Sequence, residues 1–317
     1  MLYVATALNL EAPASDAGKE SSISRAVATL SEAGYEIRRL PPEGEVPEDC
    51  AALLLAGFEQ APGPERMEAL RRYLDGRDGR AVFMIDPGMP EPAVLELTPL
   101  LARYGIGIRP DAVAIAPKLD DYARLVGYVD RLNLVVPEGM AGHPIAADMA
   151  RKPVPFRRAC PLLPGHGGLE QMLEPQALLV SPFSSWGETD YIPGSSINAF
   201  DRDRDVAAPL MLAAVAEPPT QVDGTVLGGP KVVVFGSSRS FTDACAADNA
   251  ACLRLLRNAV DWMAHEYDVG EIRPRILKTE SLSVPARRLR MGRWGFIAGL
   301  PLLVVALGIA VWLARRR

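Results

Sequence analysis

Six polar or aromatic side chains lie where strands are expected to end, which makes them the best candidates for binding chemistry. They are Asp86, Ser184, Trp186, Glu188, Ser237 and Arg239. Ligands of α/β proteins bind beyond the carboxyl ends of the strands, so we expect these residues to contact a ligand or a partner. Two alternatives stay open. The serines of the loop FGSSRSFTD could satisfy their own backbone groups, and Trp186 could be a structural residue that closes a loop.

The sequence offers little support for catalysis or for a cofactor. Nucleophilic catalysis needs an activated nucleophile with a base beside it, and no such pair is evident here. The histidines, His143, His166 and His265, lie in separate segments, and the four cysteines are scattered, so neither set has the spacing of a zinc site. The phosphate-binding patterns GxxxxGK[ST] and GxGxxG are absent. We therefore predict no catalytic residue, no cofactor and no metal.

Strand and helix patterns alternate through the first 104 residues, which are the elements that must position Asp86. Continuous apolar runs such as ALLLAG are typical of strands covered on both faces, whereas apolar residues spaced by three and four predict helices. The expected strands are 2–8, 35–40, 52–57 and 81–86, and the expected helices are 19–33, 64–74 and 92–104. This alternation predicts an α/β fold with a mostly parallel, doubly wound sheet.

The rest of the body is less regular but ends in two strong elements. A looser insertion or subdomain is expected over about 105–230, where proline and glycine are frequent. Its expected strands are 112–116, 132–136, 176–181 and 208–216. A strand at 231–236 and a helix at 248–265 follow. We therefore predict one α/β domain over 1–265.

The charge distribution divides the chain into an acidic body and a basic tail. Residues 271–317 carry ten basic and two acidic side chains, while the first 270 carry 24 basic and 37 acidic ones. An acidic body argues against a nucleic-acid partner. The tail contains 21 uncharged residues, 294–314, which at 1.5 Å per residue would span roughly 31 Å of a bilayer.

This segment predicts a single transmembrane helix whose ends lie in the lipid interface. A basic juxtamembrane connector at 266–293 precedes it and a basic stop at 315–317 follows. Gly295 and Gly299 form a GxxxG pair that would let a partner helix pack closely. Arginines flank both ends, so charge alone does not orient the span.

The order of strand 52–57, a helix and strand 81–86 resembles the class I glutamine amidotransferase-like fold. In that fold the second strand ends in an elbow that carries a nucleophilic cysteine. Asp86 occupies the elbow here, followed by Pro87 and Gly88, and no cysteine is nearby in the sequence. The resemblance therefore implies a non-catalytic relative.

Nearly the whole chain resembles the Gldg family, the auxiliary components of gliding-motility-type ABC transport systems. The segments that carry the resemblance include LYVATALN, LLARYGIGIRPDAV, GHPIAADM, ALLVSPFSSWGETD, KVVVFGSSRSFTD and NAACLRLLRNAVDWMA. It implies a non-catalytic body outside the cytoplasm that is held at the inner membrane. The implied partners are an ABC permease, a separate ATPase subunit and the lipid bilayer, with a polymer or lipid-linked cargo. Family members usually have an N-terminal membrane segment before the opening strand, so we expect one to be missing here.

Two other functions remain open at this point. The chain could be a membrane-anchored module that binds a sugar or a polymer without any transporter. It could also be an amidotransferase-like hydrolase that uses Asp86 or a loop serine, although the base that such an enzyme needs is not apparent.

Overall fold

The fold is taken from a computed structural model of the chain. It describes residues 1–13, 15–76, 78–116, 132–136, 142–149, 153–165, 175–192, 199–217, 229–246, 250–264 and 315. All of these except residue 315 belong to one compact unit, Met1–Tyr267. In this part of the chain nine strands form one large sheet, whose main path runs β2-β1-β3-β4-β14-β13-β9-β5, with β10 paired to β13.

Five strands of this sheet run parallel, and we call them the parallel half. They are β2 (Ile37–Arg39), β1 (Leu2–Thr6), β3 (Ala52–Ala56), β4 (Arg80–Met84) and β14 (Lys231–Phe235). The pairing of β4 with β14 joins segments about 150 residues apart, from Lys231 opposite Arg80 to Phe235 opposite Met84. This register brings the carboxyl ends of the two strands to the same edge of the sheet.

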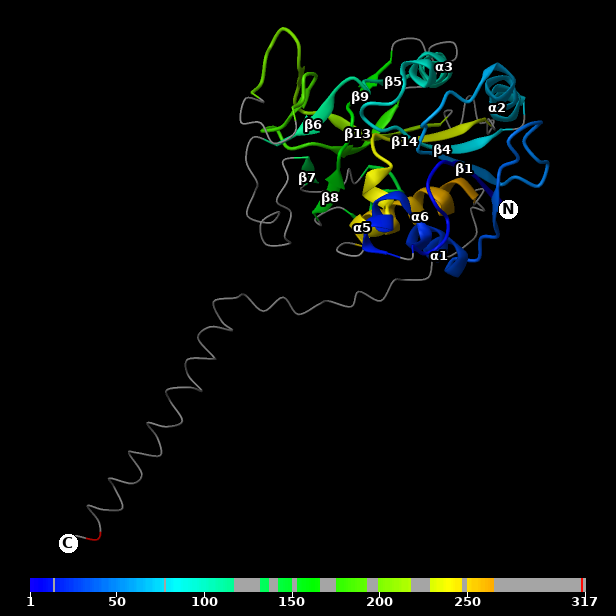
Figure 1. The fold of residues 1–317 in the computed structure, drawn as a ribbon, viewed down its shortest axis with the longest axis horizontal. Coiled ribbons are helices and arrows are strands. Elements are labelled where there is room, and N and C mark those ends of the chain that lie inside the picture. Colours follow the sequence, from blue (N-terminus) through cyan, green and yellow to red (C-terminus); the bar gives the residue numbers. More distant parts are fainter. Residues whose placement is uncertain are drawn as a thin grey trace. The chain divides into compact units, whose positions relative to one another are not determined.

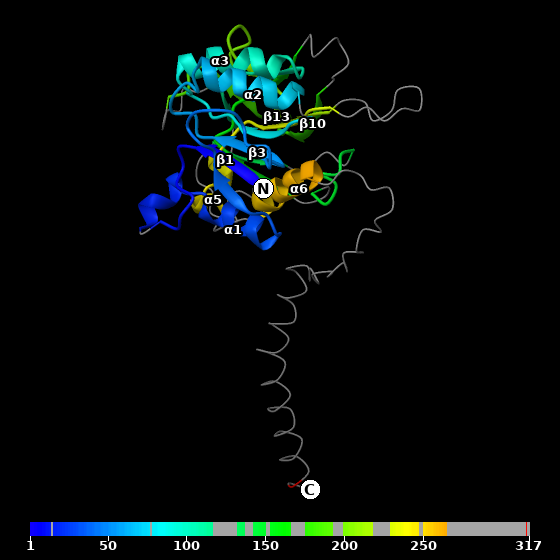
Figure 2. The ribbon, with the colours of Figure 1, turned by 90° about the vertical axis from the view of Figure 1, so that its right-hand side faces the viewer.

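Helices cover both faces of the parallel half (Figures 1 and 2). Helices α1 (Ser24–Glu32) and α6 (Ala251–Ala264) pack on one face, and α2 (Pro64–Gly76) and α3 (Glu91–Ala102) pack on the other. Successive strand residues point to opposite faces, so Val82 faces α1 and α6 while Phe83 faces α2 and α3. Two large apolar cores result, one on each side of the sheet.

The remaining strands of the large sheet are antiparallel. They are β13 (Met211–Ala216), β9 (Leu162–Pro164), β5 (Ile106–Ile108) and β10 (Gln176–Val180). The predicted mostly parallel, doubly wound sheet of amidotransferase-like type is therefore wrong, because the sheet is mixed. Parallel neighbours need a long crossover that is usually a helix, and regular strand–helix alternation occurs only in the first part of the sequence.

Two smaller antiparallel sheets lie beside the large one. The first, which we call the small sheet, has the order β12 (Val206–Ala207), β11 (Trp186–Glu188) and β6 (Val113–Ile115). The second pairs β7 (Asn133–Val136) with β8 (Val154–Arg157). Short helical segments complete the described elements: η1 (Asp16–Ser21), η3 (Arg239–Phe241) and α5 (Asp243–Ala246).

The first helix begins later than its sequence pattern predicts. The expected helix at 19–33 is divided into η1 and α1, and α1 starts at Ser24. Asp243 explains this start, since its carboxylate accepts hydrogen bonds from the Ser24 hydroxyl at 2.7 Å and the Arg25 amide at 2.8 Å. A carboxylate that accepts from the first amides of a helix stabilises its N-terminus. Here that carboxylate comes from a remote segment.

The predicted fold class is also corrected at its C-terminal end. Among the residues that the structure describes, no helix combines the length and the apolar composition needed to cross a bilayer. The expected span at 294–314, with Gly295 and Gly299, lies outside the described residues, as does the connector at 266–293.

Candidate functional site

The carboxyl ends of β4 and β14 meet through Asp86 and Ser238. The Asp86 carboxylate accepts the Ser238 amide at 2.8 Å and the Ser238 hydroxyl at 2.5 Å. Burial raises the pKa of Asp86 above its ordinary value, while the bonds from Ser238 and the charge of Arg239 act in the opposite direction. Both carboxylate oxygens are thus engaged by the neighbouring strand end, which fixes the position of Asp86.

The turn after Asp86 is held by its backbone. Gly88 has a φ of +76°, a conformation that favours glycine, and its amide donates to the Pro110 carbonyl at 2.7 Å. The tertiary structure also brings a thiol to this elbow that is remote in the sequence. Cys160 is fully buried and its sulfur lies 3.4 Å from the Ile85 carbonyl. Burial raises the pKa of Cys160, and the nearby charge of Asp86 raises it further, so the group stays a thiol.

A pocket of about 420 Å³ opens beside Asp86, between the parallel half and the small sheet. This volume lies in the range that small-molecule sites occupy. Its charged and aromatic lining residues are Asp86, Asp111, Arg158, Glu188, Tyr191 and Arg239. Val113 and Leu132 supply apolar surface.

Glu188 enters the pocket from the small sheet. It is only 6% exposed, and one of its carboxylate oxygens accepts the indole N–H of Trp186 at 3.0 Å. No other described residue donates a hydrogen bond to this carboxylate. Trp186 in turn packs edge-on against Phe200, with ring centroids 6.4 Å apart. A buried carboxylate with a single protein donor has capacity left for a hydrogen bond from a ligand.

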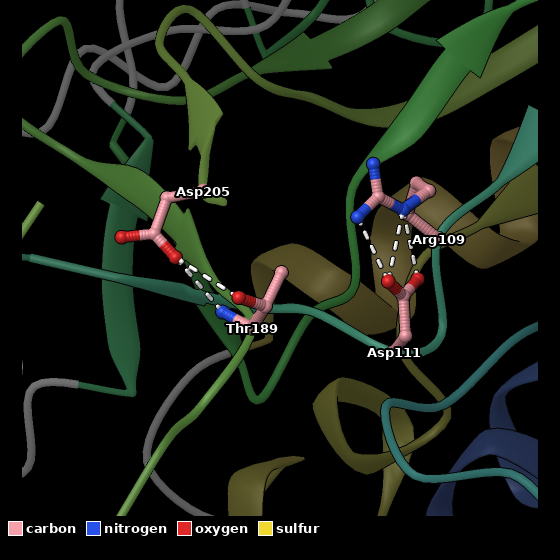
Figure 3. A network of polar contacts seen from close by, with 4 residues as sticks. All are labelled: Arg109, Asp111, Thr189 and Asp205. Carbon is pink, nitrogen blue, oxygen red and sulfur yellow. Dashed lines mark hydrogen bonds and ion pairs between the residues drawn. The ribbon is translucent and has the colours of Figure 1, made fainter. Parts of the chain in front are cut away.

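Two side-chain pairs stiffen the rim of the pocket (Figure 3). Asp111 accepts from the Arg109 guanidinium in a fork, with distances of 2.8, 3.1 and 2.8 Å. This contact lowers the pKa of Asp111. At the ends of β11 and β12, Asp205 accepts from the Thr189 amide at 3.1 Å and from its hydroxyl at 3.2 Å. The Thr189 hydroxyl and amide are therefore held by the same carboxylate oxygen.

Arg158 is the least constrained charged group of the pocket. Its side chain is exposed, and among the described residues its guanidinium has no ionic or hydrogen-bonding partner. Its backbone, by contrast, is fixed in the left-handed region at a φ of +46°, and its amide donates to the Leu132 carbonyl at 2.9 Å. Non-glycine residues in this region are uncommon and tend to occur at functional positions.

The structure brings three of the six candidate residues to one pocket. Asp86, Glu188 and Arg239 line it, whereas Ser184, Trp186 and Ser237 do not. Ser184 is exposed on the loop between β10 and β11, and Trp186 is buried behind Glu188. The buried Ser237 hydroxyl donates to the Arg157 carbonyl at 2.5 Å.

Four polar lining residues were missed in the sequence: Asp111, Arg158, Thr189 and Tyr191. Arg158 follows β8, whose pattern is hidden by Pro155 within the strand and by Pro153 directly before it. Asp111 lies in the turn between β5 and β6, where the strands are three residues long. Short strands carry too little alternation for detection, so the residues that follow them were not singled out.

The described residues contain no group of three or more histidine, cysteine or acidic side chains that could hold a metal ion. The pocket lining has neither a histidine nor a cysteine. What the arrangement offers is recognition: guanidinium donors, a buried carboxylate acceptor and an apolar wall.

Comparison with solved structures concerns the fold. The mmIFT52 N-terminal domain is 15% identical, with a TM-score of 0.53, over 84% of this chain and 98% of that domain. A cold-adapted beta-galactosidase from Rahnella sp. R3 is 11% identical, with a TM-score of 0.42, over 80% of this chain and 31% of the enzyme. At 15% identity the first likeness shows a shared fold only, and the second supports no fold assignment.

Sequence comparison assigns the chain to a family. No curated protein sequence matches it. A family profile described as "ABC-type uncharacterized transport system", for ABC transport auxiliary proteins, matches residues 5–170, which is more than half of the chain. This match covers Asp86, Asp111 and Arg158. The chain therefore belongs to the auxiliary family of ABC-type transport systems.

Proposed function

We propose that this chain is a non-catalytic auxiliary subunit that binds the permease of an ABC-type transport system and receives cargo in its pocket. The observation that carries the proposal is the pocket between Asp86 and Glu188, in a chain of the ABC transport auxiliary family. The finer assignment, to the gliding-motility type of system, is part of the proposal. So is a position at the inner membrane with the body outside the cytoplasm.

The state of the polar groups supports a binding role over a hydrolytic one. Asp86 is engaged by Ser238, the Cys160 thiol is buried with a raised pKa, and Thr189 is held by Asp205. Asp86 and Thr189 are therefore committed to hydrogen bonds within the protein and the Cys160 thiol stays protonated, which favours binding over covalent catalysis. An Asp86→Ala variant that abolished a measurable hydrolytic activity would contradict this part of the proposal.

Co-purification from native membranes tests the association. We expect the tagged full-length chain, extracted in mild detergent, to bring down a multi-span permease and a separate ATPase with a Walker motif. A tagged protein of unrelated family from the same membranes is the control. Recovery of the chain without either subunit would contradict the proposal.

Protease protection in oriented vesicles tests on which side of the membrane the body lies. We expect the body to be cleaved only by protease added to the extracytoplasmic side.

A second candidate function is a binding module for a sugar or a polymer that works without a transporter. The mixture of guanidinium, carboxylate and aromatic groups in the pocket favours it. Saccharide binding without co-purifying transport subunits would support this candidate over the first.

A further inference from the structure

We propose that the pocket binds an acidic saccharide, a sugar ring bearing a carboxylate or phosphate, with the anion on Arg158 and a ring hydroxyl on Glu188. This inference rests on the proposed function in that it takes the pocket to be the cargo site. It goes further by naming the chemical class of the ligand.

The acidic side chains of the pocket differ in how many hydrogen bonds the protein already donates to them. Asp86 accepts two hydrogen bonds from Ser238, and Asp111 accepts a fork from Arg109. Glu188 accepts only the indole N–H of Trp186 among the described residues, although it is buried. Buried carboxylates are stable when their lone pairs are used, so Glu188 has the strongest need for a donor from a ligand. A sugar hydroxyl supplies such a donor.

The basic side chains of the pocket also differ in how many hydrogen-bonding and ionic partners the protein provides. Arg239 lies beside Asp86, whose charge it partly balances, and its guanidinium donates to the Glu20 carbonyl at 2.9 Å. The Arg158 guanidinium has neither kind of partner among the described residues. A planar guanidinium with free donors matches a carboxylate or phosphate, which it can bind through two parallel hydrogen bonds. Arg158 is therefore the anion-binding group of this pocket.

The backbone at Arg158 provides an independent argument. An arginine at a φ of +46° is held in a conformation that favours glycine or asparagine. The surrounding contacts impose this conformation, since the Arg158 amide is bonded to Leu132 and the next residue, Ala159, accepts from the Ala114 amide at 2.7 Å. The geometry fixes the point from which the long side chain extends and lowers the cost of positioning it on a ligand.

The apolar wall accounts for the ring. Tyr191 packs against the cluster of Val113, Ile115, Leu132 and Trp186, and the pocket is lined by Tyr191, Val113 and Leu132. Sugar rings combine apolar C–H faces with hydroxyl edges, so this wall suits a face of the ring while Glu188 takes an edge. A simple inorganic anion would use Arg158 alone and leave Glu188 and the wall without contacts.

Binding of three probes to the full-length chain in detergent tests the inference by calorimetry or saturation-transfer NMR. The probes are glucuronate, glucose 6-phosphate and glucose. We expect the better of the two acidic sugars to bind at least about tenfold more tightly than glucose, a factor that corresponds to one good charged hydrogen bond. The stronger acidic probe distinguishes a carboxylate from a phosphate ligand. Equal binding of all three probes, or binding of none, would overturn the inference.

Single substitutions test the roles proposed for Arg158 and Glu188. Arg158→Gln removes the charge, so we expect it to bind the acidic sugars about as weakly as glucose. Glu188→Gln should weaken all three sugars, because its partner is a hydroxyl. The matched control is Arg204→Gln, since Arg204 is exposed, pairs with Asp190 and lies outside the pocket lining. Unchanged discrimination in Arg158→Gln, with native circular dichroism, would contradict the inference.

The two proposals fail separately. Arg158→Gly suits the left-handed backbone, so we expect this variant to remain folded, to lose the preference for acidic sugars and still to co-purify with the transport subunits. Co-purification without preference for acidic sugars in the wild-type chain would overturn the ligand assignment alone. Loss of co-purification in a chain that binds acidic sugars would overturn the auxiliary role alone.

Discussion

The parallel half and the small sheet form opposite walls of the same pocket, but they are stabilised by different means. The parallel half has helices on both faces, and the residues of its strands β3, β4 and β14 are almost all buried. The small sheet has strands of two or three residues and a core of four buried apolar side chains among the described residues. Its order depends on polar contacts, namely Trp186 with Glu188 and Thr189 with Asp205.

The two walls therefore contribute different properties to the pocket. The parallel half provides a rigid wall, because apolar burial on both faces resists local opening. The small sheet supplies Glu188 and Val113 to the pocket, and Thr189 follows directly after β11. Substitutions that change the pocket lining on the small sheet should therefore cost little stability. Substitutions in the parallel half should cost more, because a core that is close-packed on both faces transmits the resulting strain. Three experiments test this comparison.

Truncating one buried isoleucine in each wall should produce the largest effect. Ile85 and Ile115 are both fully buried, but Ile85 packs in one of the two large cores and Ile115 in the four-residue cluster. We expect Ile85→Ala to lower the free energy of unfolding by about 4 kcal/mol and Ile115→Ala by about 2 kcal/mol, since a small cluster collapses more readily around a cavity. Urea unfolding followed by circular dichroism measures both. Equal losses would break the comparison.

Adding a methyl group at a glycine of each wall gives the intermediate effect. A Cβ at Gly236, after β14, would lie 2.3 Å from the Cys160 carbonyl oxygen, which is backbone and cannot turn away. A Cβ at Gly187, in β11, would lie 2.7 Å from a ring carbon of Pro161 and 3.1 Å from Val206. We expect Gly236→Ala to cost about 3 kcal/mol and Gly187→Ala about 1 kcal/mol.

The control for this pair is Gly76→Ala in α2. A Cβ there would meet no atom within 4 Å, and alanine favours the helix, so this variant should be neutral or slightly stabilised. Thermal unfolding of the three variants ranks them. A Gly187→Ala variant less stable than Gly236→Ala would show that the small sheet is the more rigid wall.

The smallest expected effect is on the pH dependence of the free energy of unfolding. It arises from Asp86, which follows β4 at the end of the parallel half. A carboxyl whose pKa is raised by folding binds more protons in the native state, so its contribution to stability falls as pH increases from about 3.8 through the raised pKa. In an Asp86→Asn variant, the introduced amide could still accept the Ser238 N–H and donate to the Ser238 hydroxyl. We therefore expect this variant to change the free energy of unfolding by no more than about 1 kcal/mol at neutral pH.

Comparing the two proteins across the pH range measures this contribution. The stability of the wild-type chain relative to Asp86→Asn should decline as pH rises through that window. Asp111→Asn is the opposite control, because Arg109 lowers the pKa of Asp111 and stabilisation by this pair is lost as pH falls below 3.8. A wild-type stability that rose with pH relative to Asp86→Asn would contradict the raised pKa.

The strands of the parallel half were predicted from the sequence, but the direction of the strands beside them was predicted wrongly. Residues 81–85 and 232–235 are all apolar, and the structure confirms strands there. The strand at 208–216 was also expected, but β13 runs antiparallel to β14. Strand direction depends on the path between strands, which local periodicity does not record.

The start of α1 illustrates the same limit. Its apolar spacing predicted a helix from Lys19, yet the helix begins at Ser24 under the carboxylate of Asp243. No local sequence pattern reports a cap that arrives from 218 residues away.

What the sequence determined by itself was the membership of Asp86, Glu188 and Arg239 in a set of strand-end candidates, because strand ends follow from local apolar runs and their breakers. The tertiary structure decided the rest. It gathered these three around one pocket with Asp111 and Arg158, and left Ser184 and Ser237 outside. The physical reason is that the parallel half and the small sheet are each assembled by a pairing between remote segments, β4 with β14 in the first and β6 with β11 in the second. Those pairings are selected by burial and backbone hydrogen bonding across the whole fold.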